Sequence, residues 1–196
     1  MIEKAKIPLF PLPILPIPNE RVPLHIFEPR YRQLVTDVES GDMSFGIYYS
    51  HGLNKDRLGA LVELEALVQA YDSGKSDIVV KCTDTFILSN YYNKLTPKLY
   101  PGGIITPLNA TENVQVSDSL LSDFRELLVM RKSTDIDGDF DIHDIANELQ
   151  LNIDDRLKYL KLLDIKKREA FLKERLRYLK FILKQEAKIK DNFFLN

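Results

Sequence analysis

The segment IPLFPLPILPIP, residues 7–18, holds five prolines among twelve residues, and every other position is a large apolar residue. The spacing P-x-x-P occurs at Pro8/Pro11 and Pro13/Pro16, as in ligands of domains that bind polyproline helices. However, leaving seven bulky apolar side chains in water would cost roughly 1.5–3 kcal/mol each. Because proline is tolerated at strand edges and bulges, we predict that the segment packs as an irregular edge strand of a small barrel.

The composition is that of a folded domain. The chain has 196 residues, of which 44% are apolar, and a formal net charge of −2. This length and apolar content suffice for a buried core. The small negative net charge argues against electrostatic binding of nucleic acid by the molecule as a whole. The sequence has a single cysteine, Cys82, and no run of about 18 apolar residues. We therefore expect a soluble cytoplasmic protein in a reducing compartment.

Alternating apolar residues predict β-strands in the first half of the chain. In LVELEALVQAY (61–71) and IVVKCTDTFIL (78–88) they recur with the period of a half-buried strand. The turn residues DSGKSD between the two runs predict a long hairpin, with a bulge or a twist near Asp84 that turns this carboxylate outward. SFGIYYS (44–50) and PGGIITPL (101–108) add two short strands, and the irregular spacing favours a barrel over residues 1–110. The predicted buried faces consist of Val62, Leu64, Ala66, Val68 and Ala70, and of Ile78, Val80, Cys82, Phe86 and Leu88.

From residue 111 to residue 196 the pattern predicts a helical subdomain. Residues 110–155 hold twelve acidic and three basic residues, and residues 156–190 hold thirteen basic and four acidic ones. The two segments attract each other, which favours packing them together. Asp141, Asn152 and Asp164 are predicted N-caps. A leucine stripe at helical spacing predicts a packed face on the last helix, formed by Leu172, Leu176, Leu179 and Leu183.

The opening IPLFPLPILPIPNERVPLHIFEPRYRQLV (7–35) resembles the start of the N-terminal domain of Lon proteases, the substrate-binding LON domain. The likeness continues through FGIYYS as the next strand and through LGALVELEALVQAYDSGKSDIVVKCTDTFIL as a glycine-led hairpin. The helical half resembles the C-terminal helix bundle of that family. The resemblance covers nearly the whole chain and implies an α+β fold, in which a PUA-like β-barrel precedes a helical bundle with one long terminal helix.

In Lon proteases this domain precedes an ATPase module and a Ser/Lys peptidase module, whereas this sequence stops at Asn196. The GKS at residues 74–76 lacks the earlier glycine of a P-loop, because Gln69 occupies that position, and a predicted strand follows where a P-loop has a helix. The resemblance therefore implies a free-standing LON domain without unfoldase or protease activity. We expect no enzyme and no cofactor.

Candidate binding residues lie around HIFEPRYR, residues 25–32. In the purely structural interpretation this stretch starts a helix. Pro29 fits the first helical position, where a missing N–H breaks no hydrogen bond, and Glu28 helps to satisfy the free amides there. In the functional interpretation the arginines and the tyrosine present donors and a ring beside an apolar groove between the barrel and the helical half. For His25 the alternative to a binding role is a buried core histidine with its own hydrogen bond. The predicted peptide-binding residues are Phe10, Leu12, His25, Phe27, Glu28, Arg30 and Tyr31.

Two other features, an acidic stretch and the single cysteine, could indicate metal binding or nucleophilic chemistry. The acidic stretch DIDGDFDIHD (135–144) has its glycine fourth and Ala146 twelfth, where an EF-hand requires glycine sixth and glutamate twelfth. We interpret it as a solvated loop that ends in a helix cap, and we predict no metal. Cys82 lies on a predicted buried face without an activating base, so we do not expect a nucleophile.

The leading functional hypothesis, which follows from the resemblance, is a non-catalytic module that weakly binds unfolded or exposed apolar segments of other proteins. Weak binding would require repeated contacts, dimerisation or a partner ATPase for retention. The alternative is an adaptor or regulator that docks a folded partner, such as an ATP-dependent protease, through the basic terminal helix. RNA binding is less favoured, because no aromatic-rich RNA motif accompanies that helix, and membrane binding is less favoured still.

Overall fold

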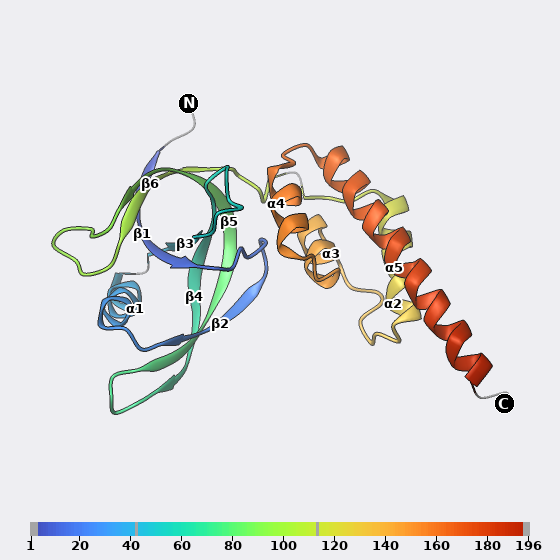
Figure 1. Ribbon diagram of the computed structural model, residues 1–196, viewed down its shortest axis with the longest axis horizontal. Helices are drawn as coiled ribbons and strands as arrows, with labels where there is room; N and C mark the ends of the chain where they lie inside the picture. The colour runs from blue at the N-terminus through green and yellow to red at the C-terminus, as the bar shows by residue number, and fades with distance from the viewer. Residues whose placement is uncertain (1–3, 42, 113, 194–196) are drawn as a thin grey trace. The chain divides into compact units, whose positions relative to one another are not determined.

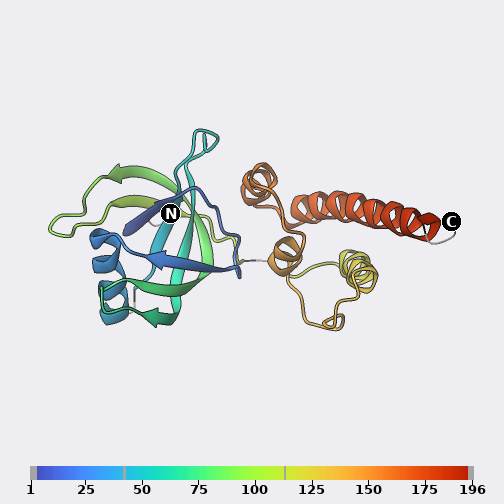
Figure 2. The same cartoon turned by 60° about the horizontal axis from the view of Figure 1, so that its bottom comes forward.

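The computed structural model describes residues 4–41, 43–112 and 114–193, which group into two compact units. One unit combines Met1–Glu112 with Asn152–Lys161, and the other combines Asn113–Leu151 with Leu162–Asn196. The first unit is a β-barrel with two helices, and the second is a bundle of helices (Figure 1 and Figure 2). The α+β class predicted from the sequence is confirmed.

Six strands form one sheet that closes into a barrel. Their order is β2-β5-β4-β3-β1-β6, and the additional pairing of β5 with β6 closes the ring (Figure 1). β5 can do this because it is long: residues 76–81 pair with β2, and residues 86–92 pair with β6. The strands are β1 (Ala5–Leu12), β2 (Arg21–Ile26), β3 (Phe45–Tyr49), β4 (Leu58–Ala70), β5 (Ser76–Tyr92) and β6 (Gly102–Pro107).

β1 carries the proline-rich opening into the barrel. Residues 5–8 pair with β6, and residues 9–12 pair with β3. Each half of β1 therefore forms backbone hydrogen bonds along one edge only, and the edge that is used changes after Pro8. A proline nitrogen, which has no hydrogen to donate, can lie on the unpaired edge. Phe10 is buried in the core. The packed interpretation is confirmed, but the predicted edge position is wrong, because β1 lies between β3 and β6.

The predicted hairpin of β4 and β5 is confirmed, together with its bulge. The register shifts between Leu61 and Val62, opposite the predicted position at Asp84. The Asp84 carboxylate accepts hydrogen bonds from the backbone N–H groups of Thr85 and Ala110, both at 2.7 Å. The bulge thus turns the carboxylate toward the chain that follows β6. The predicted inward face of β5 is buried throughout, at Ile78, Val80, Cys82, Phe86 and Leu88.

The outer half of β4 differs from the sequence prediction. β3 pairs with residues 59–62 of β4, and beyond them β5 is the one strand that pairs with β4 in the described part of the chain. Ala66, Val68 and Ala70 are exposed, so their predicted burial is wrong. The reason is length: β4 has 13 residues and β3 has 5, so the hairpin extends past the strands that could cover it.

Helix α1 (Pro29–Gly41) begins at the predicted proline. The backbone N–H groups of Tyr31 and Arg32 donate to the carbonyl of Glu28, each at 3.0 Å, so backbone oxygen satisfies the start of this helix. The apolar face of α1 packs into the barrel core beside residues from β1, β3, β4 and β5. That face consists of Tyr31, Leu34, Val35 and Val38.

Helix α4 (Ile153–Lys161) completes the first unit. Its predicted cap is confirmed, because the Asn152 side-chain oxygen accepts from the backbone N–H of Asp155 at 3.0 Å. From this helix Arg156 reaches the barrel. Its guanidinium donates to both carboxylate oxygens of Glu20, at 2.5 and 3.1 Å, and to the carbonyl of Leu15 at 3.0 Å.

The second unit contains α2 (Asp118–Met130), α3 (Ile142–Glu148) and α5 (Ile165–Phe193). Two predicted caps are confirmed: Asp141 accepts from the backbone N–H of His143 at 2.7 Å, and Asp164 accepts from that of Lys167 at 3.0 Å. No helix within the described residues is both long enough and apolar enough to cross a membrane. The predicted leucine stripe on α5 is buried at Leu172 and Leu176 and half-buried at Leu179 and Leu183.

Opposite charges join α2 to α5, as the two charge runs predict. Lys180 is 9% exposed, and its ammonium donates to Asp123 and to Glu126, each at 2.8 Å. Burial lowers the pKa of Lys180, but the hydrogen bonds to both carboxylates outweigh burial and raise that pKa above its usual value. The hydrogen bond from Lys180 in turn holds the pKa of Glu126 below its usual value.

This contact should make the second unit sensitive to acid. The lowered pKa of Glu126 adds stability above the pKa of an unfolded glutamate, and this stability is lost as the pH falls through the folded-state pKa. We expect Glu126→Gln to reduce the drop in the urea-unfolding midpoint between about pH 5 and pH 3. The exposed Glu112 supplies the control, because Glu112→Gln should keep the wild-type drop. Identical pH dependence of Glu126→Gln and wild type would contradict the expectation.

Candidate functional site

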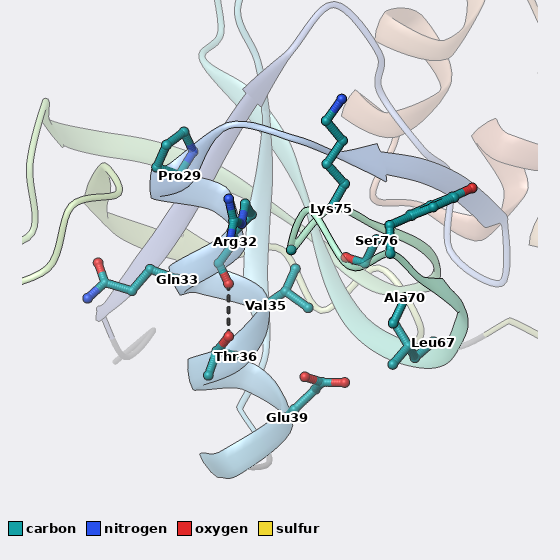
Figure 3. A pocket seen from close by; sticks show the side chains of 12 residues that line it. Pro29, Arg32, Gln33, Val35, Thr36, Glu39, Leu67, Ala70, Lys75 and Ser76 are labelled. Atoms are coloured by element: carbon teal, nitrogen blue, oxygen red, sulfur yellow. Dashed lines mark hydrogen bonds between the residues drawn. The ribbon is translucent and has the colours of Figure 1, made fainter.

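A groove runs between α1 and the outer half of the β4–β5 hairpin (Figure 3). One hollow of about 520 Å³ lies beside the hairpin turn, and a second of about 620 Å³ lies beside the end of α1. Glu39 and Leu67 line both hollows, so they are consecutive parts of one groove, here called the α1–hairpin groove. Its walls include Arg32, Val35, Thr36 and Glu39 from the helix and Leu64, Leu67, Ala70, Tyr71 and Lys75 from the hairpin.

Helical spacing gives α1 one wall of this groove. Arg32, Val35, Thr36 and Glu39 occupy positions i, i+3, i+4 and i+7, which share one side of a helix. The Thr36 hydroxyl donates to the carbonyl of Arg32 at 3.1 Å (Figure 3). The helix wall therefore has an apolar side chain near its middle and one charge of each sign at its ends.

The hairpin turn forms the opposite wall near Arg32. Gly74 has a φ of 76°, and its N–H donates to the carbonyl of Tyr71 at 2.8 Å. This confirms that the GKS stretch forms a hairpin turn. The Arg32 guanidinium lies against this glycine, because a Cβ at position 74 would fall 1.9 Å from Arg32 Nη2. The glycine thus provides both the left-handed backbone and the space that the arginine occupies.

Four large apolar side chains of the β4–β5 hairpin and the end of β2 are exposed, and two of them, Leu67 and Tyr71, line the groove. The exposed fractions are 57% for Phe27, 47% for Leu67, 63% for Val68 and 43% for Tyr71. The His25 ring bridges two of them, with its centroid 5.9 Å from that of Phe27 and 6.2 Å from that of Tyr71. Grouped exposed apolar side chains mark interaction surfaces, whereas scattered ones do not.

His25 lies at the rim of this surface, so its interpretation as a core histidine is wrong. The alternation of β2 turns it outward, where His25 Nδ1 lies 2.6 Å from an Asp77 carboxylate oxygen. The Tyr71 hydroxyl donates to the other oxygen, also at 2.6 Å. The hydrogen bond from Tyr71, followed by that of His25, lowers the pKa of Asp77, and the same bond raises the pKa of Tyr71. Asp77 therefore holds both rings in place.

The other predicted site residues form a second group at the start of α1. The rings of Phe10 and Tyr31 stack with centroids 3.9 Å apart, and these residues are 7% and 4% exposed. The Arg30 guanidinium lies 4.6 Å from the Tyr31 centroid and pairs with Glu28 at 2.8 Å. Leu12 is half-buried against the same core. Because the two rings are buried, they offer a ligand little surface, and peptide binding by this group stays a prediction.

Leu67 and Tyr71 are not among the predicted binding residues, whereas Arg32 belongs to the stretch 25–32 whose arginines were predicted to present donors. One signal was present: Leu67 and Val68 are consecutive apolar residues close to a turn, and successive side chains of a strand point to opposite faces. One of the two must therefore face outward unless both faces of the hairpin are covered.

Cys82 is not among the residues that line this groove, and the acidic loop belongs to the second unit. Cys82 is fully buried, and burial, followed by the nearby carboxylates, raises the pKa of its thiol. Within residues 4–41, 43–112 and 114–193, no three histidine, cysteine, aspartate or glutamate side chains gather as a metal site. The loop before α3 ends in the Asp141 cap, which forms a capping box with Asp144.

No protein-family model and no curated protein sequence matches this chain, but solved structures do. A Lon N-terminal domain protein from Xanthomonas campestris matches 84% of this chain and 94% of its own, with a TM-score of 0.64 and 20% sequence identity. The N-terminal domain of a Lon protease from the Mycobacterium avium complex matches 88% of this chain and 98% of its own, with a TM-score of 0.62 and 11% identity.

The chain therefore has the fold of a Lon N-terminal domain, as expected from the resemblance in its opening residues. A sheet of six strands at the N-terminal side and a long C-terminal helix belong to this fold. At these identities the likeness concerns the fold, and function has to be argued from the site.

Proposed function

We propose that this chain is a non-catalytic polypeptide-binding domain that weakly binds unfolded or exposed apolar segments of other proteins. The supporting observation is the α1–hairpin groove, which is lined by the exposed apolar side chains of Leu67 and Tyr71, on the fold of a Lon N-terminal domain. Soluble domains commonly expose such side chains singly. Here Leu67 and Tyr71 line one recess, and the exposed Phe27 ring is connected to Tyr71 through the His25 ring.

The size of the surface supports weak binding. Each apolar side chain of a ligand that becomes fully buried contributes roughly 1.5–3 kcal/mol, and association costs at least about 4 kcal/mol. Three anchored side chains therefore leave at most roughly 0.5–5 kcal/mol, which corresponds to a dissociation constant of about a millimolar or less only toward the favourable end of this range. Such an affinity suits brief sampling of many segments, and firm retention requires several contacts at once.

Replacing Leu67 by serine should weaken peptide binding about 5- to 10-fold, because about half of a leucine side chain would be buried by the ligand. A chemical-shift titration of the ¹⁵N-labelled protein with a blocked peptide rich in leucine and valine measures this. We expect the shifts in α1 and in residues 64–76, which line the groove.

Leu53 provides a matched control, since it is 50% exposed in the same unit but lies outside the groove. Leu53→Ser should bind the peptide as the wild type does. Equal weakening by both substitutions would contradict the assignment of the groove. No shifts at all with millimolar peptide would contradict the proposed function.

A further inference from the structure

We infer that the α1–hairpin groove selects apolar segments that carry an acidic residue on one side and a basic residue about three positions away on the other. This inference rests on the proposed function, because it specifies the ligand of the same groove. The supporting observation is a charge of opposite sign at each end of the groove, where neither charge is neutralised within the described residues.

The end beside the hairpin turn is positive. Arg32 and Lys75 both line this part of the groove, where α1 begins (Figure 3). The Arg32 guanidinium is half-buried against Gly74, which limits its freedom to turn into solvent. Among the described residues, no carboxylate forms an ion pair with either cation. A carboxylate on a ligand would therefore meet two cations without displacing an internal partner.

The end beside the C-terminal part of α1 is negative. Glu39 lines both hollows and Glu63 lines the second. Glu63 accepts a long hydrogen bond of 3.4 Å from the Ser44 hydroxyl, and neither glutamate has an ion-pair partner in the part of the chain that the structure describes. Glu65, which also lines the second hollow, differs because Arg21 lies 2.7 Å away and neutralises it. The two unneutralised carboxylates leave this end suited to a lysine or an arginine of the ligand.

The distance between the two ends sets the spacing in the ligand. Arg32 and Glu39 lie seven residues apart on one face of α1, which corresponds to about 10 Å at roughly 1.5 Å per residue. An extended chain advances about 3.3 Å per residue, so its two charges would stand about three residues apart. The apolar part between them, with Val35, Leu67 and Ala70 in the walls, then receives the intervening side chains.

Charge matching of this kind affects which peptide binds best more than it affects how tightly any peptide binds. An exposed charge pair changes an equilibrium only a few-fold and is screened by salt, so the test compares ligands instead of asking whether one binds. Three blocked peptides share a Leu-Val core. One has aspartate before the core and lysine after it, one has aspartate on both sides, and one has lysine on both sides.

At low salt the wild-type chain should bind the mixed peptide at least about 3-fold more tightly than either of the others. Arg32→Glu should shift the preference toward the peptide with two lysines, and Glu39→Lys toward the peptide with two aspartates. Arg32→Gln and Glu39→Gln, which disturb the helix less, should remove most of the advantage of the mixed peptide. Chemical-shift titration measures all of these affinities and also reports whether each variant is folded.

Lys94 supplies the control, because it is an exposed lysine of the same unit outside the groove. Lys94→Glu should keep the wild-type order of the three peptides. If the groove variants also keep that order while binding persists, charge selection is overturned and the proposed function stands. If none of the peptides binds the wild type, the proposed function is overturned and charge selection with it.

Discussion

Replacing Phe86 by alanine should lower the free energy of unfolding by about 3–5 kcal/mol, a large share of the stability of a single domain. Phe86 is fully buried on β5, and its ring occupies the space that two glycines leave open. A Cβ at Gly59 would fall 2.2 Å from the ring, and one at Gly46 would fall 2.8 Å from it. Because glycines have no side chains that could move into the gap, alanine would leave an unfilled cavity inside the barrel.

Ile87 follows on the same strand and is 40% exposed, so it serves as the control. Ile87→Ala should cost about 1 kcal/mol or less. Urea unfolding followed by circular dichroism measures both variants. A loss below about 1.5 kcal/mol for Phe86→Ala would mean that the barrel collapses around the cavity, and would contradict the rigid role assigned to the two glycines.

Local patterns predicted the strands and caps that depend on nearby residues. The inward face of β5 follows alternation on either side of the bulge at Asp84, and Asp141 caps its helix through amides two and three residues away. The place of β1 in the sheet could not be predicted in the same way. Its neighbours β3 and β6 begin at Phe45 and Gly102, so the order depends on how distant segments close a barrel, and alternation carries no information about that.

The groove escaped prediction for a related reason. Alternation in the outer half of β4 predicted a buried face at Ala66, Val68 and Ala70, but burial depends on whether another element covers that face. The pairing of β3 with β4 extends only to Val62 of β4. The local sequence pattern of β4 contains no information about the length of β3. The exposed hairpin and the recess beside α1 both follow from this difference in strand length.

The stretch that the sequence singled out, residues 25–32, leads into the helix that forms one wall of the groove. Pro29 starts α1 as predicted, and the groove lies along that helix. The individual side chains were harder to assign, because the direction of each depends on the phase of the helix against the barrel. Tyr31 points into the core and stacks on Phe10, whereas Arg32, the next residue, lines the groove. A difference of one position separates a core residue from a site residue.

Replacing Arg156 by alanine should destabilise the first unit by about 2–3 kcal/mol. Its guanidinium contacts both oxygens of Glu20 and the carbonyl of Leu15, and the paired side chains are only 20% and 26% exposed. Without the arginine, the partly buried Glu20 keeps the backbone N–H of Ile17 as a donor at 2.9 Å but loses its cation. Urea unfolding measures the loss.

Lys158 lies on the same helix with its side chain 64% exposed, and its ammonium is 3.9 Å from Asp155. Lys158→Ala should therefore change stability by no more than about 0.5 kcal/mol. Combining Arg156→Ala with Glu20→Gln should destabilise less than the sum of the two single changes, because both remove the same contact. Additivity within about 0.3 kcal/mol would show that the pair is not coupled, and that buried residues such as Leu157 and Leu160 hold α4 in the first unit instead.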